Sequence, residues 1–150
     1  MRHLIAGLLA SLLVGLAPSA EARLPSAAES DLVRSELVSL VPGPEGMIVA
    51  MVLRPEDRED LVAIFIGPVE ADAIQRVRRG IVPDRPLTHE LMATLLDNTG
   101  AKLERLVIDE ARDGAYLATL QLRLRDRGDP VWVDTRPSDG MTLALRAKAP

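Results

Sequence analysis

Apolar residues come in short runs through the middle of this chain, and turn-forming residues separate the runs. Residues 32–41, 47–53 and 61–66 each have the length and apolar content of a β-strand. A turn rich in Pro and Gly follows the first run, and a charged turn over residues 55–60 joins the other two. Strands joined by short turns pair as antiparallel neighbours, so the pattern predicts a hairpin over residues 47–66.

Three further segments carry apolar residues at helical spacing. The first begins at Pro68, a residue favoured in the first helical turn, and ends at Gly80. The second begins after Thr88, which is a good N-cap residue, and ends at Gly100; a third helix is expected over residues 138–146. The side chains expected to be buried are those of Val69, Ala73 and Val77 in the first helix and of Leu91, Met92, Leu95 and Leu96 in the second.

The second half of the chain holds another hairpin. Asp113-Gly114 is a strong signal for a two-residue turn, and strands are expected over residues 103–108, 116–124 and 131–133. Residues 116–124 alternate between apolar and polar side chains, as in a sheet with one face in water. Because helices are inserted between hairpins, we predict an α+β fold with a mostly antiparallel, hairpin-built sheet and about three helices.

The N-terminus has the layout of a cleavable export signal. A basic start precedes the apolar residues 4–17, and Ala20-Glu21-Ala22 places small residues where a signal peptidase reads them. An uncleaved anchor is the alternative, but the apolar run is shorter than the ~20 residues that span a bilayer. We therefore predict a periplasmic or secreted protein without a membrane segment, built of a signal peptide (residues 1–22, cleaved after Ala22), a linker (23–30) and one domain (31–150).

Composition narrows the possible chemistry. The chain has no cysteine, which excludes thiol catalysis, thiolate zinc sites and iron–sulfur clusters. Its formal net charge of −4 is unfavourable for binding nucleic acid, which depends on cations at phosphates, so a nucleic-acid enzyme of this composition needs a local basic groove. Lys102 and Lys148 are the only lysines, and the other basic residues are arginines. The guanidinium of Arg presents a planar fork of donors that matches the oxygens of a phosphate. An Arg bias also arises from genome composition.

Two residues at predicted helix starts are candidates for chemistry. Glu70 lies in the first turn of the first helix, where an acid stabilises the helix dipole or holds a metal ion or water. His89 follows Thr88 and is the only histidine beyond the predicted signal peptide. It is either a general acid or base or a solvated side chain, and the absence of a second histidine at ligand spacing excludes a multi-histidine zinc site.

Acidic residues surround Arg112 at the second hairpin. Asp113 has a sufficient structural role in the turn before Gly114, whereas the turn does not explain Glu110. Clustered carboxylates suit a hard divalent ion for phosphodiester hydrolysis, but such clusters are also common on ordinary protein surfaces.

Residues 134–139 form the stretch with the most polar candidates. Arg136 precedes a helix whose free N–H groups, together with the guanidinium, make a phosphate site, and Ser138 can cap that helix. Asp139 repels a phosphate at this place unless a cation intervenes. The alternative is a plain cap in which Arg136 pairs with Asp134 or Asp139.

Four motifs in this order resemble the bifunctional nuclease family. Residues 66–71 match Ile-Gly-x-x-Glu-Ala, and residues 85–90 match Arg-Pro-x-Thr-His-Asp except for Glu90. Residues 110–115 match Asp-Leu-Arg-Asp-Gly-Thr in part, and residues 134–139 match Asp-Ala-Arg-Pro-Ser-Asp except at one position. The resemblance covers nearly the whole predicted domain and implies cleavage of both DNA and RNA.

The resemblance also implies functional residues at the matching positions. The expected catalytic residues are Glu70, His89, Glu90, Glu110 and Asp113; the expected substrate-binding residues are Arg112, Arg136 and Ser138; the expected ligands of a divalent metal, Mg or Mn, are Glu70 and Asp139. We expect nucleic acid as the partner, and association of identical copies stays open. The rival hypotheses are a non-catalytic periplasmic binding or interaction domain with the same fold, and a domain that binds a small anionic metabolite at Arg136.

Overall fold

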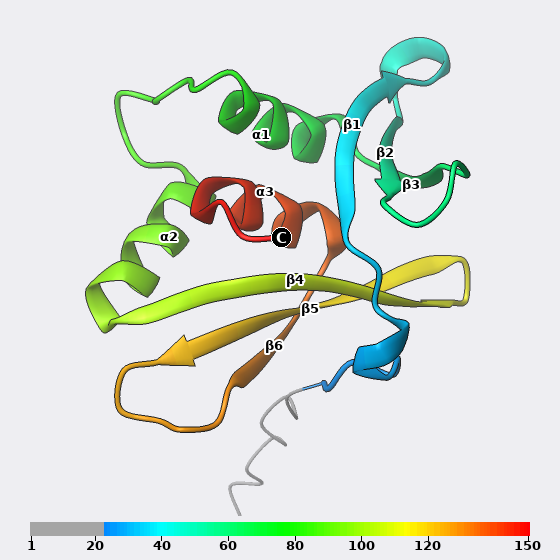
Figure 1. Cartoon of the computed structure of the whole chain (residues 1–150). Helices are drawn as coiled ribbons and strands as arrows, with labels where there is room; N and C mark the ends of the chain where they lie inside the picture. Colours follow the sequence, from blue (N-terminus) through cyan, green and yellow to red (C-terminus); the bar gives the residue numbers. More distant parts are fainter. Residues whose placement is uncertain (1–22) are drawn as a thin grey trace, which may run out of the picture.

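A computed structural model describes residues 23–150 of the chain (Figure 1), so the predicted signal peptide lies outside the described residues. Six strands and three helices follow one another from the N-terminal side to Pro150. They are β1 (Ser35–Pro42), β2 (Val49–Pro55), β3 (Val62–Ile66), α1 (Pro68–Arg78), α2 (Thr88–Thr99), β4 (Ala101–Arg112), β5 (Ala115–Leu124), β6 (Val131–Thr135) and α3 (Pro137–Ala147). Within this part of the chain, no helix has both the length and the apolar character needed to cross a membrane.

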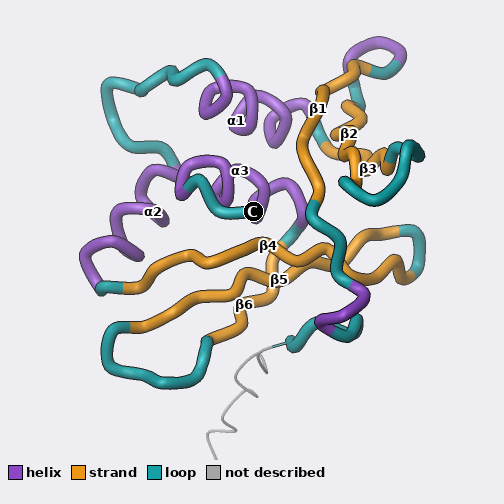
Figure 2. Tube along the Cα trace, in the orientation of Figure 1, coloured by secondary structure: helices purple, strands orange, loops and turns teal. Residues whose placement is uncertain are grey.

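The predicted α+β class, with three helices, is confirmed. The strands divide between two antiparallel sheets, β1-β2-β3 and β4-β5-β6, which lie on different sides of the helices (Figure 2). Both predicted hairpins are present. The Asp113-Gly114 turn has φ values of 51° and 80°, which is the left-handed backbone of the turn type that this dipeptide favours.

Helix α3 joins the two halves of the molecule, because it lies between α1 and the β4–β5 hairpin (Figure 1). One apolar cluster combines the inner face of the first sheet with Ala71 and Ile74 of α1, and Met141 and Leu145 of α3 pack against it. The other cluster combines Leu103 of β4 and two β5 leucines with Leu143 and Ala144 of α3. The two clusters therefore use opposite sides of one short helix.

Several predicted helix details are wrong. In α1, Val69 is 78% exposed, and Ala71 and Ile74 are buried instead. In α2, Leu91, Met92 and Leu95 are all more than 40% exposed. The reason is that α2 packs mainly against α3 and β4, so the single face through Ala93 and Leu96 is enough to attach it.

The predicted cap residues are also wrong. Leu87, rather than Thr88, is the N-cap of α2, and the Glu90 carboxylate accepts a hydrogen bond from the Leu87 N–H at 3.0 Å. Arg136 is the N-cap of α3, and Ser138 makes no side-chain cap. In both helices the N-cap side chain makes no hydrogen bond to the N–H groups of the first turn. The acids of that turn, Glu90 and Asp139, instead interact favourably with the positive end of the helix dipole.

Candidate active site at three helix N-termini

Side chains from the first turns of three helices are linked in one network around Arg136. Its NH1 donates to Oε1 of Glu70 at 3.0 Å, and its Nε donates to Oδ2 of Asp139 at 2.7 Å. The other oxygen of Asp139, Oδ1, lies 3.0 Å from Nε2 of His89. These four residues are therefore one connected network, and we call them the helix-start cluster.

Local sequence explains how each helix offers its polar residue. Pro68 and Pro137 begin α1 and α3, and each is followed two positions later by an acid, Glu70 or Asp139. At Gly67 a Cβ would collide with the Glu70 carboxylate. A side chain at position 67 would therefore make the Glu70 carboxylate shift from its present place over the helix start.

Charge pairing sets the protonation of the cluster. Partial burial raises the pKa of Asp139, but the hydrogen bonds from Arg136 and His89 outweigh it, and the pKa lies below its ordinary value. The hydrogen bond to Asp139 raises the pKa of Arg136. At neutral pH the cluster thus holds an ionised Asp139 beside a permanently charged guanidinium.

The ionised Asp139 also selects the form of the imidazole. A carboxylate only accepts hydrogen bonds, so Nε2 of His89 carries the proton in this contact. In the neutral ring the lone pair is then on Nδ1. The His89 side chain is 16% exposed, and this arrangement of imidazole and carboxylate is the one that orients a general base.

Glu90 points away from this cluster. Its Oε1 accepts from NH1 of Arg146 at 2.9 Å, while its other oxygen bonds the Leu87 N–H. Glu90 thereby ties the first turn of α2 to the last turn of α3, and its side chain is only 14% exposed. Sequence reasoning missed Arg146, because a cation in the last turn of a helix is already explained by the helix dipole.

The hairpin residues form a separate group. Nε and NH2 of Arg112 bond the two oxygens of Glu110 at 2.9 and 3.0 Å, and Asp113 occupies the tight turn. Within residues 23–150, no hydrogen bond or ion pair joins this group to the helix-start cluster. The structure thus joins Glu70, His89, Arg136 and Asp139 in one network, whereas Glu110 and Arg112 pair with each other outside it. Ser138 lies beside the cluster in sequence but is only 4% exposed.

Asp109, at a β-bulge in β4, was not singled out for a role by the sequence. Its carboxylate is fully buried and bonds NH2 of Arg23 at 2.7 Å and the hydroxyl of Ser26 at 2.8 Å. Burial raises the pKa of Asp109, but Arg23 and Ser26 outweigh this and lower it. The segment predicted as a linker is thus fastened to the outer face of the second sheet.

The expected metal ligands do not form a ready metal site. Among residues 23–150 no three His, Asp or Glu side chains are grouped so that they can hold one ion. Glu70 and Asp139 share the Arg136 guanidinium, which already supplies the positive charge between them. A divalent ion held between these two carboxylates would compete with Arg136 for them.

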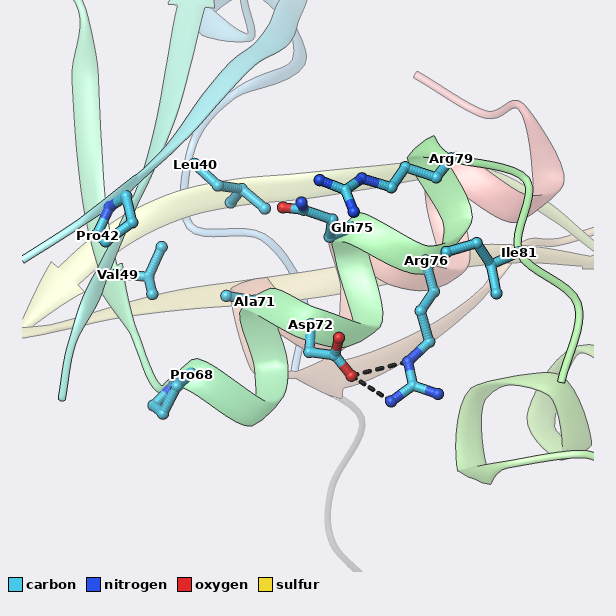
Figure 3. Close-up of a pocket in the computed structure, with 10 residues that line it drawn as sticks. All are labelled: Leu40, Pro42, Val49, Pro68, Ala71, Asp72, Gln75, Arg76, Arg79 and Ile81. Carbon is cyan, nitrogen blue, oxygen red and sulfur yellow. Dashed lines mark hydrogen bonds and ion pairs between the residues drawn. The ribbon is translucent and has the colours of Figure 1, made fainter. Parts of the chain in front are cut away.

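A small pocket between the first sheet and α1 lies apart from these residues (Figure 3). It has a volume of about 290 Å³ and is lined by side chains that include Leu40, Val49 and Gln75. Its one carboxylate, Asp72, accepts a hydrogen bond from Nε of Arg76 at 2.7 Å. The pocket contains no residue of the helix-start cluster.

Comparison with known proteins identifies the class to which this fold and cluster belong. The family model for the bifunctional nuclease domain matches residues 51–150, and the chain belongs to this family. The match begins inside β2 and includes all four residues of the helix-start cluster.

Particular relatives come from bacteria and plants. An uncharacterized protein of Mycobacterium tuberculosis is 35% identical over 100 residues, which cover 67% of this chain and 58% of that protein. The proteins named bifunctional nuclease 2 of Oryza sativa subsp. japonica and of Arabidopsis thaliana are 29% and 27% identical over 103 residues, which cover 32% and 31% of their lengths. The chain thus spans less than two thirds of each of these relatives.

Proposed function

We propose that this protein is a nuclease that hydrolyses phosphodiester bonds of DNA and RNA at the helix-start cluster. The observation that carries the proposal is the meeting of His89, Asp139, Arg136 and Glu70. Phosphodiester hydrolysis is accelerated by a group that accepts or donates a proton and by a positive charge that stabilises the phosphoryl oxygens. The oriented imidazole and the guanidinium are groups of these two kinds. Membership of the bifunctional nuclease domain family and the names of the plant relatives support the same function.

In the proposed reaction, Nδ1 of His89 accepts a proton from the attacking water. The water oxygen forms a bond to phosphorus, the bond from phosphorus to the leaving oxygen breaks, and the leaving oxygen takes a proton from the imidazolium or from solvent. Asp139 holds the ring in place and stabilises its positive charge. Arg136, whose side chain is 65% exposed, binds a phosphate oxygen while Glu70 and Asp139 fix its direction.

A divalent ion stays a prediction. When bound, Mg²⁺ or Mn²⁺ supplies charge stabilisation to phosphoryl chemistry, but the present arrangement of Glu70 and Asp139 around Arg136 does not favour it. For this reason no step of the proposed reaction uses a metal. Cleavage assays with and without a chelator decide whether an ion is needed.

The proposal is tested with purified protein lacking residues 1–22 and with labelled single-stranded DNA and RNA. We expect cleavage by the wild-type protein, and a loss of about 10²- to 10⁴-fold in His89→Ala. Glu36→Gln, an exposed carboxylate change on β1, is the control and should cleave like wild type. The variant Glu110→Gln tests separately whether the residues at the β4–β5 hairpin contribute to cleavage.

Folded protein that cleaves neither nucleic acid with any divalent ion would contradict the proposal. The non-catalytic interaction domain would then be the better hypothesis.

Export remains a second proposal, supported by the basic start and the apolar residues 4–17. N-terminal sequencing of the protein from the producing cell should begin at Arg23. A product that begins at Met1 would contradict it.

A further inference from the structure

A large groove runs along the inner face of α2. It has a volume of about 690 Å³, and its walls are α2, the last turn of α3, the start of β4 and the residues that follow α1. The floor is apolar and includes Ala93, Leu96 and Leu143. The groove is larger than the pocket beside the first sheet, and no sequence motif pointed to it.

Positively charged side chains line this groove. Lys102 and Lys148, the only lysines of the chain, both line it. Both are exposed, and neither forms an ion pair within residues 23–150. Arg125 lies beside the groove residue Gly100, because its side chain comes within 3.8 Å of a Cβ built there.

The local charge is the opposite of the charge of the whole protein. The formal net charge of the chain is −4, whereas Asp97 is the single carboxylate among the residues that line this groove. Many arginines elsewhere are neutralised by carboxylates, as Arg34 is by Glu56 and Arg58 is by Asp57. The groove is therefore the local basic surface that a nucleic-acid enzyme of acidic composition needs.

The groove also leads to the helix-start cluster. His89, Ala93, Leu96 and Gly100 follow one another at spacings of four, three and four, so they share one face of α2. Arg146, which lines the groove, bonds Glu90, the neighbour of His89. The groove and His89 therefore share one face of α2, so a strand that contacts the two lysines has a path along this face toward the imidazole.

We propose that this groove binds a single strand of the nucleic-acid substrate, with phosphates on Lys102 and Lys148 and the strand directed toward His89. This inference rests on the proposed function and adds the path of the substrate. A single strand is the favoured occupant because the site offers separate cations above an apolar floor, which suits a flexible chain of phosphates and bases.

The test measures binding of a fluorescein-labelled phosphorothioate single strand of about 12 nucleotides, a length within known site sizes, by anisotropy at several salt concentrations. Each lost phosphate contact lowers the salt slope by about 0.7. Lys102→Ala/Lys148→Ala should therefore lower the slope by about 1.4 and weaken binding about 25-fold near 0.1 M salt.

Arg34→Ala/Arg58→Ala is the matched control, because it removes the same charge from exposed side chains beside the first sheet. It should keep the wild-type slope. If both double variants lowered the salt slope and the affinity equally while the wild-type protein still cleaved nucleic acid, the groove would not be the binding path. The proposed function would then remain.

A wild-type protein that neither binds this strand nor cleaves the labelled DNA and RNA would instead contradict both proposals. Binding of a polyglutamate peptide that depends on the lysines, without binding of the oligonucleotide, would assign the groove to an acidic protein partner and overturn the proposal.

Discussion

At the scale of single residues, the contacts of Arg136 determine how the candidate site is interpreted. The sequence left open whether it clamps a phosphate or pairs with Asp134 or Asp139. In the structure it pairs with Asp139 and with Glu70, which lies 66 positions away. Its side chain remains 65% exposed, so the structural pairing and a contact with substrate are compatible.

We predict that Arg136→Ala leaves the protein folded but slow. Exposed ion pairs contribute about 1 kcal/mol or less, so urea denaturation should show a loss of that size. Cleavage should fall about 10²-fold, the cost of removing one donor to a transition-state charge. A loss of about 3 kcal/mol or more with unchanged cleavage would assign Arg136 to architecture alone.

A second prediction at this scale concerns the stability of the protein at low pH. The folded pKa values of Asp109 and Asp139 are lowered, so their contribution to stability is fully present above the unfolded value of about 3.9 and is lost as the pH falls through the folded values. The free energy of unfolding should be flat near neutral pH and fall below about pH 4.

Asp109→Asn tests this directly. Its carboxylate is fully buried against Arg23 and Ser26, so the variant should lose about 2 kcal/mol at pH 7. It should also have a shallower decline in acid than wild type. An acid decline identical to that of wild type would show that other groups cause it.

At the scale of elements, the approach of α3 to β4 depends on Gly140. A Cβ at this position would lie 2.5 Å from Cδ1 of Leu106 and 3.0 Å from Cγ2 of Thr135. Contacts this short force neighbouring groups to move. The first turn of α3, which holds Asp139, therefore packs closely against Leu106 of β4.

We predict that Gly140→Leu lowers the free energy of unfolding by about 2 kcal/mol, despite the gain of up to about 1 kcal/mol from replacing a glycine in a helix. The control is Gly128→Leu, where no atom lies within 4 Å of the added Cβ. Thermal denaturation of both variants makes the comparison. Equal melting temperatures would mean that the side chains of Leu106 and Thr135 can move aside without a loss of stability.

At the scale of the whole molecule, the two sheets are joined through α3. Met141 and Leu145 pack into the first cluster, and Leu143 and Ala144 belong to the second. An element shared by two cores couples their stability, so we expect one cooperative unfolding transition.

Ile74→Ala tests the coupling. Ile74 is fully buried between α1 and the first sheet, and its truncation should cost about 3 kcal/mol. Trp132, the only tryptophan, lies in the second sheet. Its fluorescence should nevertheless report the same lowered midpoint as far-ultraviolet circular dichroism; two separate midpoints would show that the halves unfold independently.

The sequence by itself determined what neighbouring residues control. The Asp113-Gly114 turn, the start of α1 at Pro68 and the α+β class all depend on backbone preferences within a few positions. The four motifs also located Glu70, His89, Arg136 and Asp139 before any geometry was known.

Only the tertiary structure decided which of these residues meet. His89 and Asp139 are 50 positions apart, and their contact depends on how α2 and α3 pack, which no local pattern encodes. The same packing exposed Leu91 and Leu95 and placed both lysines on one groove. Periodicity identifies an apolar helix face, but the neighbours of the helix determine whether that face is buried.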